Sequence, residues 1–265
     1  MNDDSKLGET VNQSGFPLQI ALANLVRTTT GHGWRVLCTE HSWKNTNDDA
    51  SGFMDLILEN QYQTSVLLIE CKRVLNTSWT FLNPKTQIDL RTHAKGWVSF
   101  VGNDGLKCFD WREVSLDPAS AESAYCVVPG EDRSKPLLER VAAEVVSATE
   151  AFAGEEKRFL GDSISQFRSY FSAIVTTAKL MTCSFSPDQI SITDGKISAQ
   201  EFQEVDFVRF RKQLSTHIPN SITSLQALAH AKEHTVFVIQ AEALVKFLGN
   251  FEIHENSIKN LARRL

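Results

Sequence analysis

Residues 52–74 read GFMDLILENQYQTSVLLIECKRV, and this stretch decides the fold that the sequence predicts. Two apolar runs are separated by the short polar segment 61–64, which is typical of a turn. The pattern predicts an antiparallel hairpin of two buried strands. Charged residues interrupt both strands, because Asp55 lies in the first and Glu70 and Lys72 end the second.

These three charged residues are expected to form one cluster. Side chains alternate along a strand, so Glu70 and Lys72 project from the same face, and hairpin pairing brings Asp55 close to Glu70. Two carboxylates held close together repel each other, and burial adds to the cost, unless a cation lies between them. Mg²⁺ suits such a place, since it is commonly held by one or two carboxylates and a substrate phosphate. Lys72 would lower the pKa of an attacking water or stabilise negative charge on a phosphate.

Around the hairpin, helices and strands are predicted in an order typical of an α/β protein. Apolar residues at helical spacing predict a helix in 16–33 and a longer one in 134–160. Runs rich in β-branched and aromatic residues predict strands at 34–43, 170–185, 207–212 and 235–240, and further helices are expected at 222–232 and 241–251. The predicted fold class is α/β, with a mixed central β-sheet flanked by helices.

The chain is expected to form one domain. Its 265 residues, of which 42% are hydrophobic and 22% charged, suffice for a substantial core. Residues 1–14 are polar and are expected to be a disordered segment, and 15–265 to be the domain. The expected parts of this domain are a core (16–73 and 134–182), an insertion of short strands and loops (74–133) and a C-terminal α/β extension (183–265).

The order of these elements, with the charged residues that they carry, resembles the PD-(D/E)XK nuclease superfamily, which has the restriction endonuclease-like fold. Asp55 follows a turn, and after fourteen intervening residues Glu70-Cys71-Lys72 ends an apolar strand. The resemblance implies an αβββαβ core, with Asp55 and Glu70 as metal ligands and Lys72 as the catalytic lysine. It covers residues 16–73 by motif and, by topology only, the helix and strand that follow the insertion.

Two further positions follow from the resemblance. Some members carry a glutamate on the first helix, where this chain has Gln19, so Gln19 is the candidate helix position of the site. Glu40 lies on the first strand, near the same end of the sheet by alternation, and would substitute for that glutamate as a metal ligand. Met54 stands where the superfamily pattern has a proline.

Other side chains are candidates for contacts with nucleic acid. Arg209, Arg211 and Lys212 form one concentrated basic strand, which would act as a phosphate track, and a solvated strand face is the alternative interpretation. Gln87 follows the second hairpin strand, where some nucleases use a glutamine to contact DNA. A net charge of −5 argues against binding of nucleic acid by charge alone, but not against a nuclease, whose metal ligands are acidic.

Cysteine usage and hydropathy predict a cytoplasmic protein without a membrane partner. The five cysteines are scattered and form no C-x-x-C pair, which is typical of reduced thiols rather than of a zinc ribbon. The N-terminus lacks the apolar segment of a signal peptide, and no stretch approaches the roughly 18 apolar residues of a membrane helix.

Together these features predict a metal-dependent nuclease that hydrolyses phosphodiester bonds in nucleic acid. The resemblance to the PD-(D/E)XK superfamily implies DNA as the substrate, and therefore a DNA endonuclease of restriction, defence or repair type. The expected cofactor is Mg²⁺, with Mn²⁺ as its substitute. Two alternatives stay open: a catalytically silent module of the same fold that binds nucleic acid or protein, and a nuclease subunit that is active only with a partner. A homodimer or a larger defence complex is expected, since cutting both strands of a duplex needs two active sites or two events.

Overall fold

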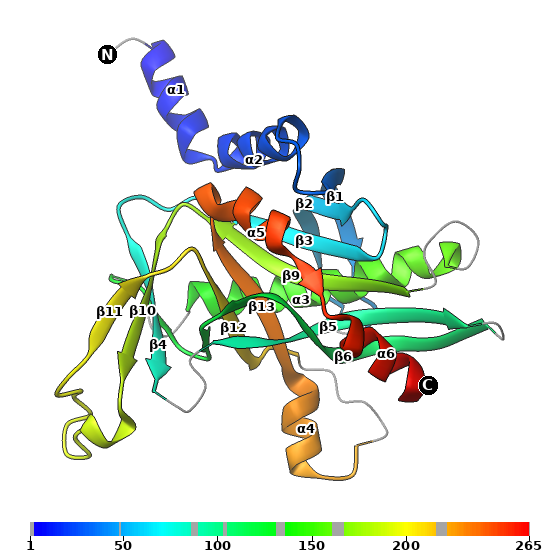
Figure 1. The fold of residues 1–265 in the computed structure, drawn as a ribbon. Helices are drawn as coiled ribbons and strands as arrows, with labels where there is room; N and C mark the ends of the chain where they lie inside the picture. The colour runs from blue at the N-terminus through cyan, green and yellow to red at the C-terminus, as the bar shows by residue number, and fades with distance from the viewer. Residues whose placement is uncertain are drawn as a thin grey trace.

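The computed structural model describes residues 3–47, 49–85, 90–102, 105–130, 136–160, 167–215 and 222–264. Over these residues the protein has a mixed central sheet of ten strands with helices on both faces, and a second sheet of four strands at one side (Figure 1). The predicted mixed α/β class, with a central sheet flanked by helices, is confirmed. None of the helices in these ranges combines the length and the apolar character needed to cross a membrane.

The first half of the chain begins with helices and continues in strands. The helices are α1 (Asp3–Gln13) and α2 (Phe16–Thr28). The strands are β1 (Trp34–Lys44), β2 (Ser51–Asn60), β3 (Ser65–Lys72), β4 (Ser78–Pro84), β5 (Arg91–Gly102), β6 (Gly105–Ser120), β7 (Glu122–Ser123) and β8 (Cys126–Val127).

The second half mixes both kinds of element. The helices are α3 (Leu137–Glu156), α4 (Leu225–Lys232), α5 (Leu244–Asn250) and α6 (Glu255–Arg264), with short 3₁₀ helices η1 (Lys157–Phe159), η2 (Pro187–Gln189) and η3 (Ala241–Ala243). The strands are β9 (Phe167–Thr176), β10 (Lys179–Phe185), β11 (Glu201–Glu204), β12 (Phe207–Gln213), β13 (Glu233–Gln240) and β14 (Glu252–Ile253).

The central sheet is built around the predicted hairpin. Strands β2 and β3 pair antiparallel, with Leu56 opposite Ile69, so the hairpin is confirmed. Strand β1 pairs with the other side of β2, and β9 runs parallel to β3, which gives the order β1-β2-β3-β9 at this edge. The sheet continues through β13 and β12 to β7, while β5 pairs with β9 and brings β6 with it. Because β3 and β9 are parallel, the chain must cross between them, and the crossover contains α3.

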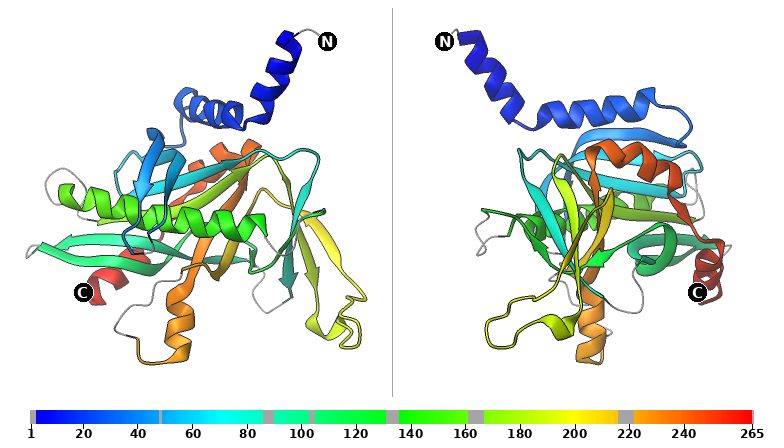
Figure 2. Two further views of the ribbon diagram at one scale, coloured as in Figure 1. Left: turned by 180° about the vertical axis from the view of Figure 1, so that it is seen from behind. Right: turned by 60° about the vertical axis from the view of Figure 1, so that its left-hand side comes forward.

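Helices cover both faces of this sheet, as the front and back views show (Figures 1 and 2). Helix α3 packs on one face through residues at helical spacing such as Val141 and Val145. Helices α2 and α5 pack on the other face, with Leu22 and Phe247 among their buried residues. All ten residues of β9 are buried, as expected of a strand that has parallel neighbours and helices on both sides.

The second sheet extends from the end of β3 and β9. Strands β4 and β10 follow β3 and β9 after short turns and pair with each other in parallel, and β11 and β8 pair with their outer edges. The segment 170–185, predicted as one strand, is therefore divided between two sheets. The bend at Thr177 and Ala178 separates β9 from β10 and turns the chain away from the central sheet.

Two expectations about the remaining segments are wrong. Residues Asp3–Gln13 form helix α1 instead of a disordered segment, with Leu7 and Val11 one helical turn apart. The insertion does not consist only of short strands, since β5 and β6 are 12 and 16 residues long. They are long because they pair with each other from Arg91 to Gly102 and form one extended hairpin.

Candidate active site

Three neighbouring strands bring acidic residues into one row. In the β1–β2 pair, Thr39 lies opposite Leu56 and His41 opposite Met54, so the residue between them, Glu40, lies opposite Asp55. In the β2–β3 pair, Leu56 opposite Ile69 is the last pair, and Asp55 and Glu70 are the next residues of their strands, near enough for the charge of Asp55 to act on Glu70. The row Glu40, Asp55, Glu70 therefore crosses β1, β2 and β3 at the end of the sheet where β3 finishes.

Asp55 lies where the regular backbone pairing of β2 and β3 stops. Here the side chain of Asp55 accepts a hydrogen bond from the backbone of β3. The backbone N–H of Cys71 donates to Asp55 Oδ2 at 2.6 Å. Burial raises the pKa of Asp55, and the carboxylate of Glu40 raises it further, while the bond from Cys71 and the charge of Lys72 oppose the shift. The balance lies with burial, so the charged form of Asp55 is destabilised by its surroundings.

Glu70 and Lys72 form an ion pair on β3. Lys72 Nζ donates to Glu70 Oε1 at 2.5 Å, which confirms that the two side chains share a face of the strand. Burial and then the nearby carboxylate of Asp55 raise the pKa of Glu70, although Lys72 favours its charged form. The exposed Glu144, on α3, adds to the negative field at Glu70. One lysine therefore compensates only part of the acidic charge of this cluster.

Gln19 joins helix α2 to this row. It is buried, and its side-chain amide donates to Glu40 Oε1 at 2.5 Å and to the backbone oxygen of Asp55 at 2.8 Å. Glu40 has a φ of 51°, in the left-handed region that a residue with a side chain rarely adopts. A neutral amide at position 19 adds no further negative charge beside Glu40 and Asp55, and its two bonds fix where both residues lie.

The carboxylate oxygens of this site are ligand atoms that suit a magnesium ion, and a magnesium site needs only a few of them from the protein. Glu40, Asp55 and Glu70 carry three negative charges when ionised, against the one positive charge of Lys72. No group of three or more His, Cys, Asp or Glu side chains in the described ranges is arranged to hold a metal ion. Mg²⁺ usually keeps several waters and binds one or two carboxylates, so Asp55 and Glu70 fit it as a pair. Glu40 is bonded to Gln19 and is a less direct candidate.

The basic strand predicted as a phosphate track is β12, and its arginines face inward. Arg209 is fully buried and donates to the backbone oxygens of Leu116 and Pro118 and to Ser120 Oγ. Burial lowers its pKa to about 10. Because its guanidinium is enclosed, the expectation that Arg209 contacts nucleic acid is wrong.

The other residues of the predicted track are held by carboxylates. Arg211 pairs with Glu113 and Glu233, and Lys212 Nζ donates to Glu139 at 2.8 Å. These ion pairs occupy the charges that a phosphate would need. Gln87 lies outside the described residues.

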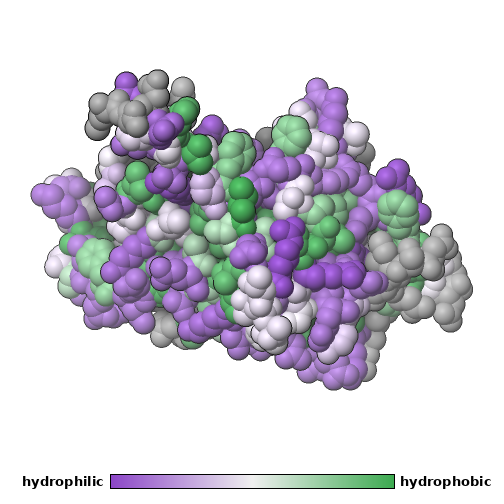
Figure 3. All heavy atoms as spheres, turned by 90° about the horizontal axis from the view of Figure 1, so that it is seen from above, coloured by the Kyte–Doolittle hydropathy of each residue, from purple (hydrophilic) through white to green (hydrophobic). Residues whose placement is uncertain are grey.

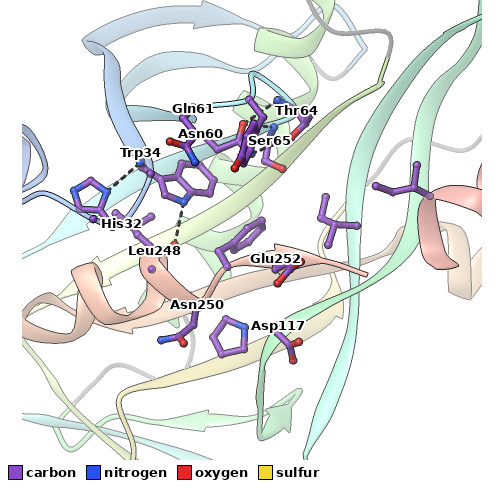
Figure 4. Close-up of a pocket in the computed structure, with 18 of the residues that line it drawn as sticks. His32, Trp34, Asn60, Gln61, Thr64, Ser65, Asp117, Leu248, Asn250 and Glu252 are labelled. Atoms are coloured by element: carbon purple, nitrogen blue, oxygen red, sulfur yellow. Dashed lines mark hydrogen bonds between the residues drawn. The ribbon is translucent and has the colours of Figure 1, made fainter. Parts of the chain in front are cut away.

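A separate cavity lies at the opposite end of the hairpin (Figure 4). Its volume is about 830 Å³, and its lining includes Asn60 at the end of β2 and Ser65 at the start of β3. His32 and Trp34 line it with their polar atoms already engaged: Trp34 N–H donates to His32 Nδ1, and Trp34 Nε1 donates to the oxygen of Leu248. None of the predicted site residues that the structure describes lines this cavity, and its described lining contains no Lys or Arg.

Sequence reasoning had no means of finding two features of the site. The backbone N–H of Cys71 holds Asp55, and a backbone group cannot be recognised from the type of residue. The sequence indicates Gln19 as a position of the site, but not that its side chain bridges two strands. Comparisons of the chain with protein-family models, with curated proteins and with solved structures find no match.

Proposed function

We propose that the protein is a metal-dependent nuclease that hydrolyses phosphodiester bonds in DNA. The proposal rests on one observation: Asp55 and Glu70 lie close together just past the last pair of the buried hairpin, and Lys72 is bonded to Glu70. Both carboxyl groups have a raised pKa. A metal-free protein gains nothing from burying two close carboxylates, whereas a divalent cation would compensate for their repulsion.

The chain topology supports the same proposal. With the inserted strands β4–β8 set aside, the elements follow in the order α2, β1, β2, β3, α3, β9, and the strands lie side by side as β1-β2-β3-β9 with β9 parallel to β3. This order supports the αβββαβ core that the resemblance to the PD-(D/E)XK superfamily implies. Residues far apart in sequence, such as Lys72 and Thr176, are paired at the end of the sheet that carries the acidic row.

Each residue has a distinct part in the proposed reaction. Asp55 and Glu70 would hold Mg²⁺, or Mn²⁺ in its place, and the bound ion would supply an activated water and charge compensation on the phosphate. Lys72 carries an ammonium group that donates to Glu70 and would turn one of its protons toward a phosphate oxygen, where it stabilises the negative charge of the transition state. Gln19 holds Asp55 in place through its backbone oxygen.

A partner subunit that contributes the nucleic-acid contacts is the second candidate arrangement. Two features of β12 favour it: Arg211 and Lys212 form ion pairs within the chain, and Arg209 is buried. None of these three side chains of β12 is therefore free to bind phosphate. The net charge of −5 points the same way. In this arrangement the chain supplies the catalytic residues and a partner supplies the affinity for DNA.

Cleavage assays with purified protein test the proposal. Supercoiled plasmid, single-stranded DNA and RNA are incubated with the protein in Mg²⁺, in Mn²⁺ and in EDTA. Nicking or linearisation of the plasmid that requires the metal is the expected result. Metal-dependent cleavage of RNA alone would show that the substrate is RNA and not DNA. Stable binding of DNA without cleavage in any metal would favour the catalytically silent module.

A further inference from the structure

Helix α1 stands away from the rest of the protein (Figures 1 and 2). It contacts α2, the helix that follows it. Leu7 and Val11 lie one turn apart on α1, and 63% and 58% of their surfaces are exposed. The helix thus presents an apolar stripe that the described part of its own chain does not cover.

An isolated helix of this kind is not stable by itself. It has 11 residues, whereas helices shorter than about 12–15 residues are marginal in water even when they are rich in alanine. It contains Gly8, Thr10 and Val11, which are poor helix formers, and no alanine. A surface that packs against Leu7 and Val11 would supply the stabilisation that the local sequence lacks.

A second apolar stripe of the same length lies on α2. Phe16 and Ile20 are one turn apart and are 59% and 68% exposed. They lie outside because the opposite side of α2, with Leu22 and Val26, faces the sheet. The face of the molecule that carries α1 and α2 shows apolar patches set among hydrophilic surface (Figure 3).

We propose that α1 docks on α2 of a second copy of this chain, in a symmetric dimer. With the two helices antiparallel, Leu7 packs against Ile20 of the partner subunit and Val11 against Phe16 of the partner subunit. A twofold axis repeats the contact, so both exposed stripes of both chains are buried together. The dimer buries every apolar side chain of the two stripes, because each chain carries both the stripe on α1 and the stripe on α2 against which it packs.

Charge complementarity supports this antiparallel arrangement. Asp4 precedes Leu7 by about one turn of α1, and Arg27 lies about two turns beyond Ile20 in the last turn of α2. Both side chains are exposed. The antiparallel contact brings the acidic start of α1 to the basic end of α2 of the partner subunit, where opposite charges attract and the helix dipoles also align favourably.

The oligomeric state tests the interface, and the result does not depend on the proposed nuclease activity. Sedimentation and light scattering of the full chain over a concentration series should give a mass twice the 29.7 kDa of one chain. Leu7→Glu and Ile20→Glu should each raise the dissociation constant by about 30-fold or more, the effect of losing one central apolar contact. Circular dichroism and thermal unfolding confirm that each variant keeps its fold.

A matched control makes the same substitution outside the two stripes. Ile192, between β10 and β11, is fully exposed, so Ile192→Glu should leave the dimer unchanged. Arg27→Glu and Asp4→Arg should each raise the dissociation constant about threefold or more, and the two changes together should restore it. A wild-type monomer at every concentration would overturn the proposal, as would a dimer that survives Leu7→Glu or one that Ile192→Glu also disrupts.

Discussion

Asp55 and Glu70 lie close together just past the last pair of β2 and β3, and Glu70 has a raised pKa because it is buried and because the carboxylate of Asp55 is near. The pair is therefore a local cost to the folded protein in the absence of a cation. Lys72, bonded to Glu70, offsets part of this cost. The relationship links the stability of the fold to the chemistry proposed for the site.

Removing the charge of Asp55 should stabilise the metal-free protein. Asp55→Asn keeps an oxygen that can accept the Cys71 N–H and removes the carboxylate that opposes Glu70. We expect the free energy of unfolding to rise by about 0.5–2 kcal/mol at neutral pH, the usual size of a single stabilising change, and cleavage activity to be lost. Urea unfolding measures the effect, with Asp188→Asn at an exposed position as the control of equal charge.

The sign of the pH dependence follows from the raised pKa values. Because the pKa values of Asp55 and Glu70 are raised, the folded protein holds the protons of these carboxyl groups more tightly than the unfolded chain does. The folded protein therefore loses stability as the pH rises through the raised pKa values. The stabilisation by Asp55→Asn should therefore shrink when the pH falls low enough to protonate the wild-type carboxyls. If the stabilisation by Asp55→Asn stayed constant from about pH 4 to about pH 8, the charge of the Asp55 carboxylate would not be its cause.

Magnesium should stabilise the wild-type protein in a manner that depends on pH. Binding to the folded state alone adds about 2.7 kcal/mol at a concentration 100 times the dissociation constant. Because protons compete for Asp55 and Glu70, the rise in melting temperature should be larger at about pH 8 than at about pH 5. Glu70→Gln should abolish the rise, whereas Glu201→Gln, at an exposed position, should leave it intact. Equal stabilisation of both variants would place the ion elsewhere.

Arg168 should be important for stability rather than for catalysis. It is 1% exposed, and its guanidinium donates to Glu59 on β2 and to Glu156 at the end of α3. Arg168→Met leaves two carboxylates with fewer partners in a buried place, so we expect the free energy of unfolding to fall by about 3–5 kcal/mol. Arg158→Met, at an exposed position of η1, serves as the control. A loss below about 1 kcal/mol would show that the network is dispensable.

Arg209 should likewise affect folding and not nucleic-acid binding. Arg209→Met removes the bonds to the backbone oxygens of Leu116 and Pro118, and those buried acceptors lose their donor. We expect a loss of about 1–3 kcal/mol in the free energy of unfolding, and unchanged affinity of the folded protein for DNA. Fluorescence anisotropy with labelled duplex measures the affinity. A large loss of affinity without loss of stability would restore this arginine to the binding surface.

The local parts of the site could be predicted from the sequence. Alternation along one strand is enough to place Glu70 and Lys72 together, and a short polar turn is enough to pair β2 with β3. Both inferences need only neighbouring residues, whose side-chain directions follow from strand geometry.

The parts that depend on distant segments could not be predicted. The sequence pattern of β12 placed Arg209 beside Arg211, but whether a strand face is solvated depends on what covers it, and carbonyl groups of β6 enclose Arg209. The unusual backbone of Glu40 and its bond to Gln19 likewise need α2 and β1 to meet in space. The division of 170–185 between two sheets follows from the pairing of β10 with β4, which local periodicity does not specify.

The role of Lys72 is tested by the single-turnover rate of plasmid cleavage in Mg²⁺ for the wild-type protein, for Lys72→Ala and for Lys179→Ala. Lys179 starts β10 and pairs with Glu204 in an exposed place, so it controls for the loss of one lysine. We expect Lys72→Ala to lower the rate by about 100-fold or more, the size of effect expected when a charge that stabilises the transition state is removed, while Lys179→Ala retains the wild-type rate. Equal rates for all three proteins, or cleavage that persists in EDTA, would contradict the assignment of this site.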